Sequence, residues 1–136
     1  MEKLKMLYDK INWEVVEKNL DKEIEDMEAS DDINWVFDLL LKVEKPTLED
    51  MLSYYEERFI YLFNILTNSI YLEKYEVSAK VRILMDYLND EMIRIGKLHL
   101  EEDDMDEIVS LISMTRDIKL STINQIINIK SNEKKV

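Results

Sequence analysis

Apolar residues recur every three or four positions along most of this chain, which is the spacing of amphipathic α-helices. The clearest stripe places six apolar residues one helical turn apart: Val77, Val81, Leu84, Leu88, Met92 and Ile95. Similar stripes fall over residues 13–27, 33–41, 51–70 and 105–112, and a shorter one over 4–11. The pattern therefore predicts an all-α protein, a single-domain bundle of about five to six helices.

Residues with capping preferences mark several of the predicted helix ends. Asn12 precedes the first long stripe as an N-cap. Thr47 and Asp50 have the spacing of a capping box, with Asp50 in place of the usual Glu. Gly96 follows the clearest stripe, where a left-handed C-cap favours glycine. These residues predict where three of the helices begin or end.

Two stretches leave the helix boundaries less defined. A weakly marked break falls over residues 68–73. The isoleucine-rich stripe over 123–129 fits either a short helix or a β-strand, because branched side chains suit strands without forbidding helices. We expect the bundle to occupy residues 1–131 and residues 132–136 to form a frayed tail. The predicted core contains Trp13, Phe37, Phe59, Leu62, Leu84, Leu88 and Ile112.

The composition excludes several kinds of catalytic site. The chain has one glycine, one proline and no cysteine, so glycine-rich phosphate loops, disulfides, thiolate zinc sites and cysteine nucleophiles are not available to it. His99 is the single histidine, which excludes a two-histidine metal site within one chain. We interpret His99 as a loop or cap residue. We predict that the protein is not an enzyme and has no cofactor and no metal site.

The charge is strongly acidic, with 30 acidic against 18 basic residues and a net charge of −12. Such a chain is repelled by nucleic acid, and its one basic concentration is Lys130, Lys134 and Lys135. We expect no binding to DNA or RNA by the protein alone. The sequence has no apolar run long enough for a membrane span and no visible secretory signal, so we expect a cytoplasmic protein.

An acidic run over residues 101–107 provides the candidate binding residues. Carboxylates favour the first turn of a helix because they interact with its exposed N–H groups, but one or two are enough for that. A calcium loop is excluded because the run lacks alternating ligands and a glycine. We therefore predict a surface that binds a basic protein partner through four residues of this run: Asp103, Asp104, Asp106 and Glu107.

One segment resembles a known family. Residues 81–88 read Val-Arg-Ile-Leu-Met-Asp-Tyr-Leu and residues 93–97 read Ile-Arg-Ile-Gly-Lys. This is similar to the long central helix of GINS subunits, which are helicase-activating components of DNA replication forks. Leu100 followed by four acids resembles the start of the family's next helix, and the resemblance covers about residues 47–118. It implies a non-enzymatic scaffold assembled with paralogous subunits and the replicative helicase.

Three hypotheses of function follow from these observations. The first is a non-enzymatic scaffold subunit within a hetero- or homo-oligomer, such as a GINS-like component of the replication helicase assembly. The second is an acidic inhibitor or nucleic-acid mimic, encoded by a virus or plasmid, that blocks a nucleic-acid enzyme. The third is a helical enzyme or metal carrier that uses carboxylates alone. The sequence favours the first because it contains ample core and no catalytic constellation.

Overall fold

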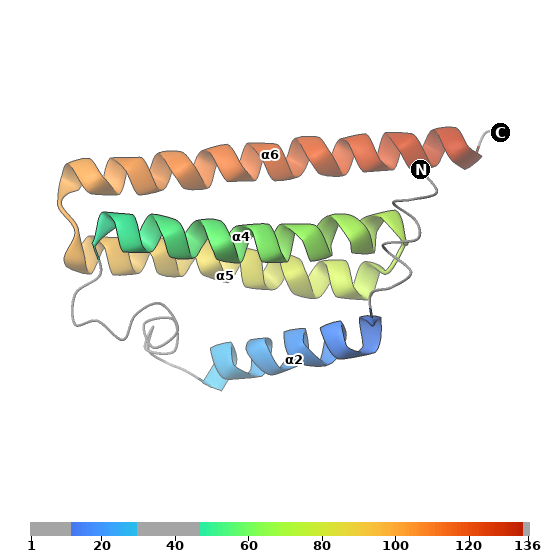
Figure 1. Cartoon of the computed structure of the whole chain (residues 1–136), viewed down its shortest axis with the longest axis horizontal. Coiled ribbons are helices and arrows are strands. Elements are labelled where there is room, and N and C mark those ends of the chain that lie inside the picture. The colour runs from blue at the N-terminus through green and yellow to red at the C-terminus, as the bar shows by residue number, and fades with distance from the viewer. Residues whose placement is uncertain (1–11, 30–46, 135–136) are drawn as a thin grey trace.

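The computed structural model of this chain is all-helical over the residues that it describes, 12–29 and 47–134. The described helices are α2 (Trp13–Ala29), α4 (Leu48–Tyr71), α5 (Tyr75–His99) and α6 (Glu102–Lys134). Helices α4, α5 and α6 lie side by side in an up-down-up arrangement, and α2 lies on the other side of the α4–α5 pair from α6 (Figure 1). The predicted all-α class is confirmed.

The prediction of five to six helices is slightly too high for the described part of the chain, which contains four. The stripes over 105–112 and 123–129 belong to one helix, α6, of 33 residues. No glycine or proline follows Gly96, so nothing in the sequence interrupts the helical backbone, and the isoleucine-rich stripe is helix. Helix α6 also continues through residues 132–134, where a frayed tail was predicted. The stripes over 4–11 and 33–41, which include Phe37, lie outside the described residues.

The capping predictions for α2 and α4 are confirmed. The Asn12 Oδ1 atom accepts a hydrogen bond from the Val15 backbone N–H at 3.3 Å. At the start of α4, the Asp50 N–H donates to Thr47 Oγ1 and the Thr47 N–H donates to an Asp50 carboxylate oxygen, both at 3.2 Å. These reciprocal bonds form a complete capping box. The shorter Asp side chain thus performs the role of the usual Glu.

The predicted break between α4 and α5 is a tight turn. The Lys74 N–H donates to the Ser69 carbonyl at 2.7 Å, and the Glu73 N–H donates to the Ile70 carbonyl at 3.1 Å. This is the hydrogen-bond pattern of a Schellman motif, whose C′ residue adopts the left-handed conformation. Glu73 occupies that position with φ of 60°. The turn therefore places a non-glycine residue where glycine is favoured, which explains why the sequence marks it weakly.

The predicted C-cap at Gly96 is wrong. Gly96 is buried inside the last turn of α5, which continues to His99 and ends at Leu100. A Cβ atom at Gly96 would lie only 2.3 Å from the sulfur of Met105. The Met105 side chain would have to move to accommodate a larger residue, because α6 packs closely on α5 just after the turn that joins them. Glycine is therefore favoured by packing and not by a left-handed φ.

The core lies between α4, α5 and α6. Four of the predicted core residues are buried, namely Leu62, Leu84, Leu88 and Ile112. Trp13 and Phe59 are half-buried and pack against the edge of the core. Trp13 is the first residue of α2, where the bundle ends, and its ring lies 5.5 Å from the Lys74 ammonium. Phe59 faces the seam between α4 and α6.

Helix α2 packs on the core through one apolar face, of which Trp13, Val16, Ile24 and Met27 are only partly buried. Among its side chains that the structure describes (residues 13–27), Leu20 alone is fully buried. Glu23 forms an ion pair with Arg58 of α4. Lys80 of α5 bonds the carboxylates of Glu17 at 3.1 Å and Asp21 at 2.8 Å. These bonds, with Asp21 the larger contributor, raise the pKa of Lys80 above its ordinary value.

In the described part of the chain, no helix combines the length and the apolar character that crossing a membrane requires.

Candidate functional site

The strongest candidate site is a groove along the seam between α4 and α6. Two neighbouring cavities, of about 440 and 350 Å³, share the lining residues Leu52, Leu111 and Met114 and so form one continuous depression. Helices α4 and α6 run in the same direction here (Figure 1), so the groove follows the helix axes. We call this feature the α4–α6 groove. Its shape is elongated, as a site for an extended or helical segment requires.

Two residues of an aromatic row on α4, Tyr55 and Phe59, line one wall of the α4–α6 groove. The rings of Tyr55 and Phe59 stack with centroids 6.1 Å apart, and those of Phe59 and Phe63 stack with centroids 5.3 Å apart. The three residues are spaced four apart in sequence, which places them on one helix face. Stacked aromatic pairs contribute about 0.5–1.5 kcal/mol beyond the area that they bury, so the contacts favour this arrangement of the rings.

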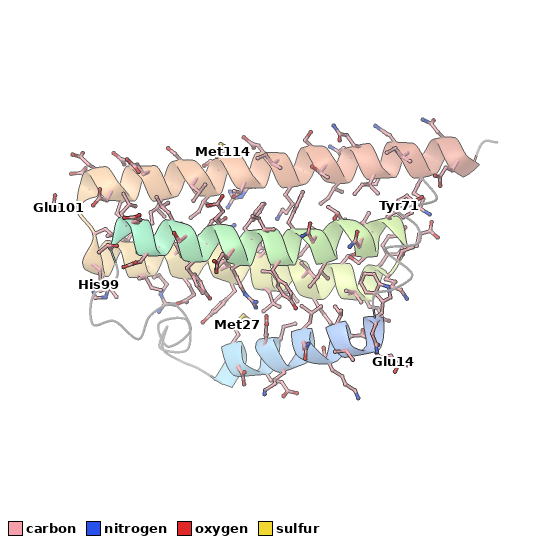
Figure 2. All side chains as sticks on the ribbon, in the orientation of Figure 1. Glu14, Met27, Tyr71, His99, Glu101 and Met114 are labelled. Carbon is pink, nitrogen blue, oxygen red and sulfur yellow. The ribbon has the colours of Figure 1, made fainter. Side chains whose placement is uncertain are left out.

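The outer edge of the groove exposes large apolar side chains. Ile60 is 52% exposed and Met114 is 55% exposed, and both line the smaller of the two cavities, the one of about 350 Å³. Ile118, one turn beyond Met114 on α6, is 46% exposed. Met114 is labelled on the outer side of α6 in Figure 2. Contiguous exposed apolar side chains of this size are typical of protein interaction surfaces.

The charged residues that line the groove are all acidic. Glu56, Asp106 and Glu107 line it, and none of its lining residues is basic. Asp106 and Glu107 are two of the four predicted binding residues. The other two, Asp103 and Asp104, lie in the first turn of α6 and do not line the groove. The structure thus brings half of the predicted set onto an apolar surface and leaves the other half at the helix start.

A buried polar network lies beneath the groove and joins the three long helices. The Tyr55 hydroxyl donates to Asn89 Oδ1 of α5 at 2.5 Å and lies 2.9 Å from Thr115 Oγ1 of α6. Since the single Tyr55 proton goes to Asn89, the Thr115 hydroxyl donates either to Tyr55 or to the Ile112 carbonyl at 3.0 Å. Burial raises the pKa of Tyr55, against smaller opposing effects from Thr115 and Arg116. The network therefore remains neutral and fixes the relative positions of the groove walls.

A second buried polar group, Glu91 of α5, lies apart from the groove. Its side chain is almost completely buried, and Oε1 accepts a hydrogen bond from Arg94 at 3.1 Å. Its other oxygen, Oε2, has no hydrogen-bond partner among the described residues. Burial raises the pKa of Glu91, while the Arg94 charge and the nearby Tyr87 hydroxyl lower it by less. The carboxyl group is thus held in an environment that favours its protonated form.

The described residues offer no metal site built from side chains. Within residues 12–29 and 47–134, no three His, Asp or Glu side chains gather closely enough to hold an ion. His99 is the last residue of α5, at the negative end of the helix dipole. Figure 2 places it at the end of the bundle where α5 turns into α6, near Glu101. His99 therefore does not belong to the α4–α6 groove.

The apolar half of the site was not predicted from the sequence. Ile60, Met114 and Ile118 fall outside the main stripes of their helices, and an apolar residue outside the buried stripe is the available signal for such a surface. That signal becomes useful only once α4 and α6 are known to be neighbours.

No family model, no curated protein and no solved structure matches this chain.

Proposed function

We propose that this protein is a non-enzymatic interaction subunit that binds a basic, amphipathic helix of a protein partner in the α4–α6 groove. The observation that carries the proposal is the combination of exposed apolar residues and carboxylates, without basic residues, along one elongated depression. Partner binding would complete an assembly of which this chain is one subunit. The cellular setting that we propose is cytoplasmic.

The groove favours a helix as its occupant. An amphipathic helix binds by inserting apolar residues spaced three and four apart into a groove of matching shape. The aromatic wall and the Met114 side of α6 provide such a groove between two helices. The described helices expose no strand edge to which an extended peptide could add.

The charge favours a basic occupant. Asp106 and Glu107 at one end and Glu56 along the wall would lie beside the polar edges of the bound helix. Their attraction would act mainly on the association rate, because long-range steering increases encounter more than it slows dissociation. Salt would weaken this attraction as the Debye length shortens to about 8 Å near physiological ionic strength.

A GINS-like subunit of the replication helicase assembly is the specific form of this proposal that the sequence resemblance supports. The two segments that carry the resemblance, residues 81–88 and 93–97, both lie within the single helix α5. In that form the partner would be a paralogous subunit or the helicase itself.

The occupant of the groove can be identified by site-specific crosslinking. A photo-crosslinking residue placed at Met114 or Ile60 should capture one partner in cells of the native organism. The same residue at Val15, a half-exposed position on α2, serves as the control and should not capture that partner. Crosslinking of the chain to itself would indicate a homodimer through the groove and would contradict the proposed basic partner.

The effect of the Asp106 and Glu107 charges on partner binding can be separated from the effect of the protein's total charge. With the captured partner, Asp106→Asn combined with Glu107→Gln should lower the association rate about 3- to 10-fold at low salt. Glu25→Gln combined with Asp26→Asn removes the same charge from an exposed part of α2 and should have a much smaller effect. Equal effects of the two pairs, or a rate that does not respond to salt, would refute the role of Asp106 and Glu107.

A nucleic-acid mimic remains the alternative proposal, and one observation favours it. Beside the start of α5, a cavity of about 480 Å³ is lined by four carboxylates and a single base, Lys74. The carboxylates are Glu14, Glu17, Glu73 and Glu76. A mimic would bind the basic cleft of a nucleic-acid enzyme and would be displaced by duplex DNA. Competition by DNA for the captured partner distinguishes this alternative from helix binding in the α4–α6 groove.

A further inference from the structure

A separate cavity lies between the C-terminal part of α6 and the start of α5, away from the α4–α6 groove. It has a volume of about 380 Å³, which lies within the size range of small-molecule sites. Its floor contains Ile70, Ser78 and Ile123, all buried, and its walls include Ile126 and Ile127. We call it the isoleucine cavity. It shares no lining residue with the α4–α6 groove.

Two of the three charged residues that line the isoleucine cavity are basic. Arg82 and Lys130 line it together with one acid, Glu73. The chain has 30 acidic and 18 basic residues, so a cavity of average composition would be lined by more acids than bases. The cavity therefore combines an apolar interior with a locally cationic entrance.

Lys130 is held in position at this entrance. Its ammonium group lies 4.5 Å from the centroid of the Tyr71 ring of α4. Such a cation–π contact restrains a lysine side chain that would otherwise sample many rotamers. The charge at the rim is thus partly ordered before a ligand binds.

The floor cannot bind an anion, because its polar group already uses its proton. Ser78 Oγ lies 2.7 Å from Ser69 Oγ and 3.2 Å from the Lys74 carbonyl, so its hydroxyl proton is donated within the protein. A ligand would therefore place its apolar part over the isoleucines and its negative group at the rim, near Arg82 and Lys130. This separation of apolar and anionic parts defines the chemistry of the ligand.

We propose that the isoleucine cavity binds a small amphipathic anion, a carboxylate with a medium-length apolar chain. The chain would fill the space between the isoleucines of α4 and α6, and the carboxylate would bind the two cations at the rim. Tyr75, which is 63% exposed at the first residue of α5, would cover part of the chain. This site is independent of the partner-binding groove.

Calorimetric titration of the full chain with decanoate tests the proposal. Decanoate should bind with a dissociation constant on the order of 1 mM or tighter. Nonyltrimethylammonium carries the same alkyl chain and the opposite charge, and the net charge of −12 favours a cation over an anion at the surface in general. Decanoate should nevertheless bind more tightly. Equal or weaker binding of decanoate would overturn the proposal. The proposal would also be overturned if the protein bound anionic phospholipid vesicles but not free decanoate.

Variants locate the bound ligand. Arg82→Gln and Lys130→Gln should each weaken decanoate binding about fivefold, the size expected for an exposed ion pair. Lys18→Gln and Lys97→Gln, exposed lysines elsewhere on the molecule, are the matched controls and should leave it unchanged. Ala79→Leu adds apolar volume at an exposed lining position and should weaken binding at least tenfold without loss of helical content. Unchanged binding in Ala79→Leu would place the ligand elsewhere and overturn the proposal.

Discussion

The hydroxyl oxygen of Tyr55 lies 2.5 Å from Oδ1 of Asn89, in the interior between α4 and α5. Because Thr115 of α6 lies within hydrogen-bond distance of the same hydroxyl, one oxygen atom joins three helices that are far apart in sequence. Apolar contacts alone tolerate sliding of one helix along another. A buried polar contact does not, since a displaced partner leaves a polar atom without a hydrogen bond.

The first prediction tests this network. Tyr55→Phe should lower the free energy of unfolding by about 1–3 kcal/mol, because Asn89 and Thr115 lose a buried partner. Urea unfolding followed by circular dichroism measures the change. Tyr61→Phe removes a hydroxyl from a residue that is 42% exposed and should change stability by less than about 0.5 kcal/mol. Equal effects of the two substitutions would show that the Tyr55 hydroxyl has no special role.

The second prediction concerns the left-handed residue in the α4–α5 turn. Glu73→Gly should be more stable than Glu73→Ala by about 1 kcal/mol, because a Cβ atom is disfavoured at positive φ. Comparing glycine with alanine cancels the loss of the Glu side chain. At Glu76, in the first turn of α5, the order should reverse and alanine should be the more stable by up to about 1 kcal/mol. The same order at both positions would contradict the turn geometry.

The third prediction concerns the close packing of Gly96 on Met105. Gly96→Ala should destabilise the protein by up to about 1 kcal/mol, because the added methyl group meets the Met105 sulfur and the flexible Met105 side chain must move to relieve the contact. In a Met105→Ala background, the same substitution should become neutral or stabilising, since alanine favours helix by about 1 kcal/mol over glycine. A double-mutant cycle from thermal or urea unfolding measures this coupling. Identical effects in both backgrounds would mean that the two residues do not interact.

The fourth prediction concerns the pH dependence contributed by Glu91. Burial raises its pKa in the folded protein above the ordinary carboxyl value of 4.5. Between these two values the folded state binds more protons than the unfolded chain, so stability falls as pH rises through this range. Glu91→Gln has no proton to release and can still accept the Arg94 hydrogen bond. Its stability relative to the parent should therefore increase as pH rises from about 5 to 8.

Urea midpoints measured over that pH range test the fourth prediction. Glu57→Gln, an exposed position on α4, is the control and should differ little from the parent across the range. A constant difference between Glu91→Gln and the parent at every pH would indicate that the carboxyl group titrates alike in the folded and unfolded states.

Features that depend on neighbours within one helix could be predicted from the sequence. The Thr47–Asp50 capping box and the Asn12 N-cap involve residues three apart, and the stripe that contains Leu84 and Leu88 requires only helical periodicity. Each is decided locally, so the pattern of residues is sufficient. The all-α class followed from the same local signals.

Features that depend on contacts between helices could not be predicted in this way. Gly96 was assigned to a left-handed cap because its packing partner, Met105, belongs to another helix. The α4–α6 groove also requires knowledge of which helices are neighbours. Composition and position identified Asp106 and Glu107 as candidates, but could not separate them from Asp103 and Asp104. That separation depends on which residues of α6 face the wall formed by α4.

The way in which α2 is attached has a consequence for the cooperativity of unfolding. Its described side chains contribute one fully buried residue, Leu20, while its polar contacts with Arg58 and Lys80 lie near the surface and are weakened by salt. The helix should therefore open at a lower free energy than the three long helices, as a separate unit. Its backbone amides should exchange with solvent faster than those of α5, and added salt should accelerate the exchange of α2 selectively. The surface of α5 beneath it would then become accessible without unfolding of the bundle.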